Sequence, residues 1–242
     1  MFSALWHNFF FDPVYNTLVF FIDVIPRGDV GLAIIATVVV VKMILLPLSI
    51  RAVKTQRIMR EIEPKLKEIK EEYKDDKEAQ ARAMMEVYRD ANLNPFASIL
   101  LMLIQIPIII ALYLAVARGA GVPLPDINTE LLYSFVAEPV VVTMNFLQII
   151  DITEKSIILA VSAGVAQFFY TKMTMPKMPE RDPEKAPDMK EDFMRNIQLQ
   201  MRYVMPVLIA VIAYTISAAI ALYFLVSNLV GIAQEYWVRK HR

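Results

Sequence analysis

Residues 36–48, ATVVVVKMILLPL, decide the fold class of this chain. They lie within residues 30–50, a run apolar enough to cross a bilayer, because a helix needs about 20 apolar residues to span roughly 30 Å of hydrocarbon. Lys42 stands in the middle of this run, and no acidic residue lies within two helical turns on either side. A lone ammonium at that depth costs about 2.5–3.5 kcal/mol on insertion scales, so we expect Lys42 to serve a function.

The composition places the whole chain in a membrane. Of its 242 residues, 57% are hydrophobic, and the mean hydropathy is +0.45. Further long apolar runs cover residues 97–117, 156–170, 204–217 and 218–232. The net charge of zero gives no field that favours nucleic acid, and the absence of cysteine excludes disulfides and thiol catalysis. The sequence predicts an all-α polytopic membrane protein.

The positions of Lys and Arg beside the runs predict how the chain crosses the membrane. Basic residues follow the first run, are absent between 119 and 154, and return after 174 and at the C-terminus. By the positive-inside rule, this pattern predicts five spans, with the N-terminus outside and the C-terminus in the cytoplasm. The alternative treats residues 131–150 as a sixth span, which would place the later basic segments outside.

The predicted segments follow in chain order. They are an N-terminal extracytoplasmic interfacial helix (1–29), the first span (30–50), a cytoplasmic helical hairpin (51–94), the second span (95–117), an extracytoplasmic loop (118–154), the third span (155–173), a cytoplasmic loop (174–198), the fourth and fifth spans (199–217 and 218–236) and a cytoplasmic tail (237–242).

Two of these segments carry clear local signals. Asp12 is the predicted N-cap of the interfacial helix, with Pro13 at its first position and Pro26 at its end. In the hairpin, one apolar stripe recurs at helical spacing: Ile58, Ile62, Leu66, Ile69 and Tyr73. KDDK at 74–77 predicts the turn, Asp76 the cap of the second arm, and Pro64 a bend in the first.

The chemistry resides in polar residues within the spans. There is no phosphate-binding loop motif, and the two histidines lie at opposite ends of the sequence, so we expect no catalytic residue, no metal and no cofactor. Lys42 lies about eight residues, or ~12 Å, from the inner end of its span, which disfavours snorkelling. We therefore expect a water-filled cavity, lined by Lys42, Gln105, Gln167, Tyr214, Ser217 and Asn228. The alternative for each neutral member is an interhelical hydrogen bond.

Four stretches in order carry a resemblance to a known family. They are VKMILLPLSIRAVKTQRIMREIEPKLKEIKEEYKDDKEAQARAMMEVYRDANLNPF (41–96), LIQIPIIIALY (103–113), MPVLIAV (205–211) and LYFLVSNLVGIAQE (222–235). From about residue 35 to 235 the chain resembles the YidC/Oxa/Alb family of membrane protein insertases, in a short form without a large extracytoplasmic domain. The resemblance implies five spans around a hydrophilic groove in the bacterial inner membrane.

The resemblance also implies a role for Lys42, which stands five positions before Pro47 where the family has its positive groove residue. An ammonium there attracts acidic or polar residues of a client's short tail while the apolar segment moves into lipid, and no ATP is required. Gln105 aligns with a family glutamine and Asn228 with the asparagine of its SNL motif, whereas Gln167 is a candidate from spacing alone. Many bacterial members have arginine at the position of Lys42, which predicts looser attraction here.

The implied partners are nascent membrane proteins and membrane lipids, with the ribosome and the Sec translocon as further candidates and a monomer as the expected state. The hairpin is the family's contact region, through Arg57, Arg60, Lys67, Lys70 and Tyr73 in this sequence. Two alternatives remain. One is a small transporter or channel whose pathway is lined by Lys42, and the other is a membrane anchor whose hairpin recruits a partner.

Overall fold

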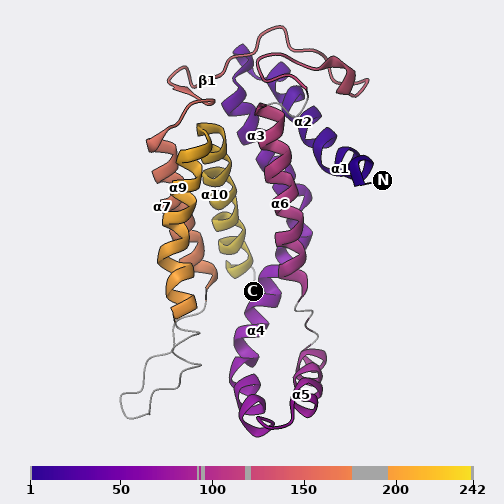
Figure 1. Cartoon of the computed structure of the whole chain (residues 1–242), viewed down its shortest axis with the longest axis vertical. Helices are drawn as coiled ribbons and strands as arrows, with labels where there is room; N and C mark the ends of the chain where they lie inside the picture. The colour runs from indigo at the N-terminus through magenta and orange to yellow at the C-terminus, as the bar shows by residue number, and fades with distance from the viewer. Residues whose placement is uncertain (1, 92, 94–95, 118–120, 176–195, 241–242) are drawn as a thin grey trace.

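The computed structural model describes residues 2–91, 93, 96–117, 121–175 and 196–240. These residues are mostly helical (Figure 1). Its elements are α1 (Phe2–Trp6), the π-helical turn η1 (His7–Phe11), α2 (Asp12–Val24), the 3₁₀ turn η2 (Pro26–Gly28), α3 (Val30–Ile44), α4 (Leu46–Glu72), α5 (Lys77–Asp90), α6 (Phe96–Ala117), the 3₁₀ turn η3 (Thr129–Leu131), β1 (Asn145–Phe146), β2 (Ile150–Asp151), α7 (Ile157–Thr174), the π-helical turn η4 (Gln200–Val204), α9 (Met205–Ile216) and α10 (Ala218–Lys240).

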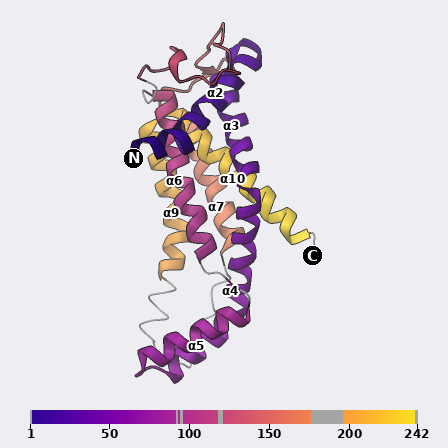
Figure 2. The same cartoon turned by 90° about the vertical axis from the view of Figure 1, so that its right-hand side faces the viewer.

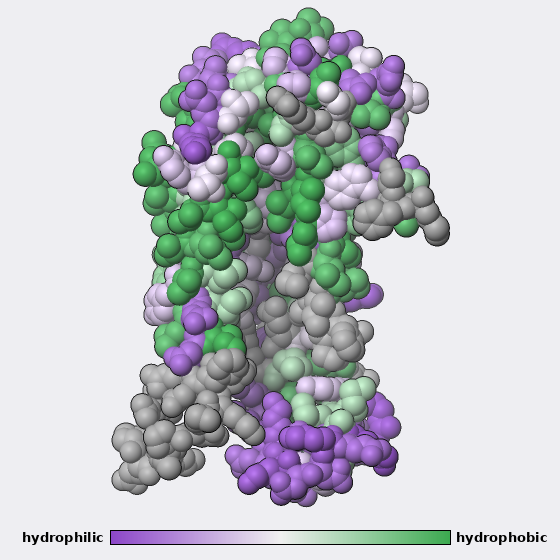
Figure 3. Space-filling view, viewed as in Figure 1, coloured by the Kyte–Doolittle hydropathy of each residue, from purple (hydrophilic) through white to green (hydrophobic). Residues whose placement is uncertain are grey.

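The helices form an elongated bundle with a different structure at each end. α10 packs against α7 and α3, α7 also packs against α9, and α6 packs against α4 and α2. Residues 121–154 cover one end, called here the loop end, and α4 with α5 extends from the other, called here the hairpin end (Figures 1 and 2). Between them the surface over α6, α7 and α9 is mostly apolar, and the hairpin is hydrophilic (Figure 3).

Length and composition identify the helices that can cross a membrane. Within the described residues, three are long and apolar enough: Ile157–Thr174, Asn196–Ile216 and Ala218–Lys240. The bent pair Val30–Ile44 and Leu46–Met59 counts as a fourth, and Leu103–Ala117 is a shorter apolar helix. The prediction of an all-α polytopic membrane protein is confirmed. The sixth span of the alternative count is not a helix, because residues 131–150 form turns and the short strand β1.

The first predicted span is not one straight helix. α3 ends at Ile44, and α4 begins at Leu46 after a bend of 62°. Pro47 explains the break, since it has no N–H to donate and its ring clashes with the carbonyl of the preceding turn. α4 then continues without interruption into the hairpin, so the helix has no boundary at the predicted position between residues 50 and 51.

The hairpin forms as its sequence pattern indicates. The side chain of Asp76 accepts hydrogen bonds from the backbone N–H groups of Glu78 and Ala79, which caps α5. The two arms meet through a small apolar cluster centred on Leu66, Ile69 and Val87. Residue 94, the predicted end of the hairpin, and most of the predicted cytoplasmic loop (174–198) lie outside the described residues.

The N-terminal helix differs from its prediction. Asp12 is not an N-cap, because its backbone is helical (φ −63°, ψ −41°) and the helix continues from η1 into α2. One face of α2 is fully buried, with Tyr15, Leu18 and Val19 at 0% exposure. α2 therefore packs into the bundle against α3 and α6, which the sequence did not indicate.

Residues 121–154 are tied to the helices by several polar contacts. Asn16 donates from Nδ2 to the Leu131 carbonyl (2.9 Å) and accepts at Oδ1 from the Tyr133 N–H (2.6 Å). Asp29 caps α3 through Oδ1 and accepts the Leu147 N–H at Oδ2 (2.8 Å). These contacts fix the loop over the ends of α2 and α3.

Candidate functional site

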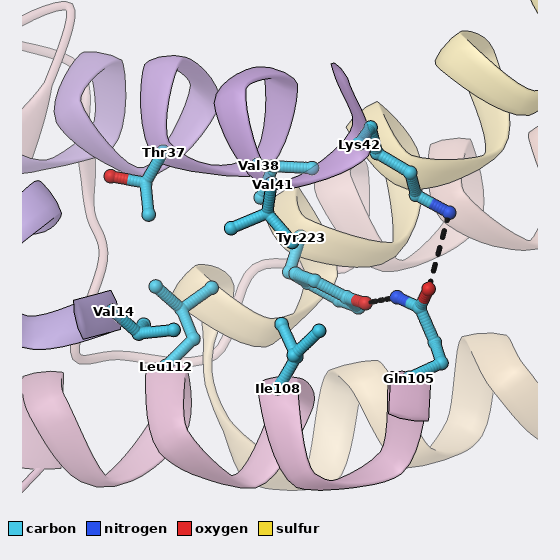
Figure 4. A pocket seen from close by; sticks show the side chains of 9 residues that line it. All are labelled: Val14, Thr37, Val38, Val41, Lys42, Gln105, Ile108, Leu112 and Tyr223. Atoms are coloured by element: carbon cyan, nitrogen blue, oxygen red, sulfur yellow. Dashed lines mark hydrogen bonds between the residues drawn. The ribbon is translucent and has the colours of Figure 1, made fainter. Parts of the chain in front are cut away.

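Lys42 lies in the last turn of α3, just before the break at Leu45. Its side chain is half-buried, and Nζ donates to Oε1 of Gln105 on α6 at 3.4 Å. Nε2 of Gln105 in turn donates to the hydroxyl of Tyr223 on α10. Three helices that are far apart in the sequence thus meet through one polar chain (Figure 4).

A pocket surrounds these three hydrogen-bonded side chains. It is lined by Val14, Thr37, Val38, Val41, Lys42, Gln105, Ile108, Leu112 and Tyr223, and it holds about 250 Å³ of empty space, part of it open to solvent. Lys42 stands at one end, and the apolar part extends toward Val14 and Thr37 (Figure 4). The Thr37 hydroxyl is already used, since it donates to the Ala33 carbonyl at 2.8 Å. The polar groups that face the pocket are therefore those of the Lys42–Gln105–Tyr223 chain.

The charge of Lys42 is not neutralised by the residues around it. None of the nine lining residues is acidic, and Lys42 makes no ion pair within the described part of the chain. Its bond to Gln105 is long compared with the usual 2.9–3.0 Å of N–H···O bonds. An ammonium has three donors, so Lys42 can bind additional acceptors. The arrangement is suited to a carboxylate or a carbonyl oxygen that enters from outside the protein.

Four other predicted lining residues do not line this pocket. Gln167 bonds within α7, to the Thr171 hydroxyl at 3.1 Å. Tyr214 is 42% exposed and lies under Lys155 at the loop end, where Ser217 forms the buried break between α9 and α10. Asn228 is only 6% exposed, and its Nδ2 has no hydrogen-bond partner among the described residues. The structure brings Lys42 and Gln105 together and leaves the other four elsewhere.

The predicted contact residues of the hairpin have different environments. Arg57 is paired with Glu61 at 3.5 Å, and Tyr73 packs against the cluster between the two arms. Lys67 and Lys70 are exposed on α4. The side chain of Arg60 lies outside the described residues. Arg57, Lys67 and Lys70 are thus the members of the set with exposed side chains.

The sequence prediction missed Tyr223, the third member of the polar chain. It is 2% exposed and lies among the apolar residues of α10. A signal was present, because a buried tyrosine hydroxyl usually finds a hydrogen-bond partner, so a tyrosine inside a span indicates a polar neighbour. Val14 was missed for another reason, since nothing in the sequence placed α2 against the spans.

Comparison with known proteins identifies the family. The family described as "60Kd inner membrane protein" matches residues 21–242. A relative named membrane protein insertase YidC from Geobacter sulfurreducens is 30% identical over 237 residues, which are 97% of this chain and 38% of the relative. Relatives of the same name from Oceanobacillus iheyensis (30% identical) and Clostridium tetani (28% identical) align with 98% and 89% of this chain and with 85% and 84% of their own lengths.

The chain thus spans about two fifths of the Geobacter relative and more than four fifths of the other two. The apolar helices and the family together identify a multi-pass inner-membrane protein. The chain belongs to the family of the 60Kd inner membrane protein, which is the YidC/Oxa/Alb family indicated by its sequence motifs.

Proposed function

We propose that this protein is a membrane protein insertase, which holds the polar tail of a nascent membrane protein at Lys42 and releases the apolar segment into lipid. The observation that carries the proposal is the uncompensated ammonium of Lys42 in a pocket walled by α2, α3, α6 and α10. The names of the relatives support the same function.

The physical steps need no bound nucleotide. The Lys42 ammonium attracts an acidic or polar tail residue, and the low dielectric of the surrounding apolar walls strengthens that attraction. The tail is then held partway across the membrane while the apolar segment partitions into lipid, which is favourable for residues such as leucine, isoleucine and phenylalanine. The exposed apolar faces of α7 and α9 offer a surface along which the segment can move: Ile158, Val161, Val165, Val207, Leu208 and Val211.

The protein has a defined orientation in the membrane and a defined set of partners in this proposal. The loop end lies outside the cell and the hairpin end in the cytoplasm, in agreement with the basic residues that follow α3. Nascent membrane proteins are the clients, and the exposed Lys67 and Lys70 are candidate contacts for a ribosome, the Sec translocon or a client. The protein acts as a monomer and without a catalytic residue, metal or cofactor.

Orientation can be tested directly because the chain contains no cysteine. Single cysteines at Gln148, at the loop end, and at Asp75, in the hairpin turn, are labelled in intact cells with a membrane-impermeant maleimide. We expect Gln148→Cys to react and Asp75→Cys to react only after the cells are opened. The reverse pattern would overturn the proposed orientation.

Function is tested by complementation of an insertase-depleted bacterium with variants of Lys42 at equal protein abundance. We expect the wild type and Lys42→Arg to restore growth, Lys42→Ala to restore it partly, and Lys42→Glu to fail. Lys172→Glu, at an exposed lysine of α7, is the control and is expected to restore growth. A well-expressed, correctly oriented wild type that does not restore growth would refute the insertase proposal. Equal rescue by all Lys42 variants would refute only the proposed role of the Lys42 charge and would leave the insertase proposal standing.

A further inference from the structure

Lys42 and Tyr223 contact opposite ends of the Gln105 amide. A glutamine amide has an acceptor end, the oxygen, and a donor end, the NH₂ group. Nε2 of Gln105 donates to the Tyr223 hydroxyl, which leaves Oε1 to face the Lys42 ammonium at 3.4 Å. If the amide were reversed, its NH₂ group would face the ammonium, which donates hydrogen bonds and cannot accept one.

The Tyr223 hydroxyl is itself fixed in place. Its side chain is 2% exposed, and the ring packs edge-to-face against Phe224 with centroids 5.5 Å apart. A ring that is buried and packed in this way has little freedom to turn, so its hydroxyl provides a rigid acceptor for the Gln105 amide.

We propose that Tyr223 is a positioning residue for the insertion reaction, which orients Gln105 so that its carbonyl oxygen holds the Lys42 ammonium toward the pocket. The inference rests on the proposed function and deepens it. With phenylalanine at 223, the NH₂ group of Gln105 loses its acceptor, and only the long 3.4 Å bond to Lys42 still holds the amide. The Lys42 ammonium then loses its fixed partner and is displaced from the position in which it meets the tail of a client.

A positioning role for Tyr223 can be distinguished from a role in which its ring only fills space. Phenylalanine retains the ring and its packing, so Tyr223→Phe removes one hydroxyl and leaves the apolar contacts unchanged. A role through Lys42 predicts that the variant affects acidic clients more than neutral ones, and that its effect disappears when Lys42 is absent. A purely structural role predicts an equal loss for every client in either background.

The test uses the purified full chain in liposomes and two synthetic clients. Each client has one leucine- and alanine-rich segment of about 20 residues, preceded by a short tail with two aspartates or, in the second client, two asparagines. Insertion is measured by protection of the tail from protease. We expect Tyr223→Phe to lower insertion of the aspartate client about fivefold, the effect of one lost hydrogen bond, and to change the asparagine client less than twofold. Tyr236→Phe, at an exposed tyrosine of the same helix, is the matched control and is expected to behave as wild type.

The outcomes distinguish the two proposals. If the wild type inserts neither client, the proposed function fails. If the wild type inserts the aspartate client and Tyr223→Phe does so equally well, only the positioning role fails. An equal loss for both clients, or an undiminished effect of Tyr223→Phe in the Lys42→Ala background, would also overturn the positioning role.

A second measurement does not depend on insertion. The acetylation rate of Lys42 in the folded protein is compared by mass spectrometry with that of the exposed Lys172 as an internal reference. We expect Tyr223→Phe to raise the relative rate for Lys42 severalfold, because the ammonium loses its fixed acceptor. An unchanged ratio would overturn the positioning role.

Discussion

Replacement of Asn16 by leucine is expected to loosen the loop at residues 129–133 without unfolding the bundle. Asn16 is 2% exposed, and its side chain makes two hydrogen bonds to this loop, one to the Leu131 carbonyl and one from the Tyr133 N–H. Leucine has a similar volume and fills the space in α2, but it can neither donate nor accept. The two loop groups lose their partners, and the rest of the packing is retained.

The magnitude follows from the two bonds. A typical intramolecular hydrogen bond contributes about 1 kcal/mol net, so two bonds contribute about 2 kcal/mol to the closed state of the loop. The full penalty for burying unpaired groups does not apply, because Leu131 is only partly buried, Tyr133 is exposed, and water can reach both once the loop opens. About 2 kcal/mol corresponds to a roughly 30-fold rise in the opening equilibrium.

Hydrogen exchange measured by mass spectrometry on the protein in nanodiscs checks this value. The peptide that contains Tyr133 is expected to exchange about 30-fold faster in Asn16→Leu, while peptides from α7 and α10 exchange as in the wild type. Asn8→Ala, at an exposed asparagine of the same N-terminal region, serves as the control and should leave the loop unchanged. Wild-type exchange at Tyr133 in Asn16→Leu, or a uniform rise throughout the protein, would refute the reasoning.

Three further predictions concern single contacts. Asp29→Ala removes the cap of α3 and the acceptor of the Leu147 N–H, so thermal unfolding should show a loss of about 1–3 kcal/mol, and Asp29→Asn should lose less because asparagine also caps helices. Gly231→Ala places a Cβ 2.7 Å from the Tyr170 ring and should cost about 1–3 kcal/mol in denaturant unfolding, with partial recovery in the double variant with Tyr170→Leu. Asp76→Ala removes the cap of α5 and should cost about 1 kcal/mol, seen as faster hydrogen exchange in the first turn of α5 only.

Several features of the fold were correctly predicted because they depend on local sequence. The hairpin follows from an apolar stripe at helical spacing and from a capping aspartate, Asp76, both of which act within a few residues. The break at Leu45 could also have been predicted, because Pro47 lacks an N–H and disrupts a helix. The prediction of one continuous span did not take this into account.

Some residues of the candidate site could also be predicted from local sequence, and others could not. Lys42 was identified because a charge inside an apolar run is costly wherever the helix packs. Tyr214 and Ser217 were grouped with it on polarity alone, yet Tyr214 faces outward at the loop end and Ser217 forms the extended break between α9 and α10. Polarity within a span does not reveal which way a side chain points, because the rotation of each helix is set by its neighbours.

The sequence by itself determined that the protein lies in a membrane, that it is helical, and that Lys42 is an isolated charge within a span. Transfer free energy and helical periodicity are properties of short stretches of sequence. Only the tertiary structure decided that α2 packs into the bundle, that Asn16 binds the loop, and that Tyr223 meets Gln105 beside Lys42. These contacts join residues far apart in the chain, and they arise from side-chain packing between helices, which no local pattern specifies.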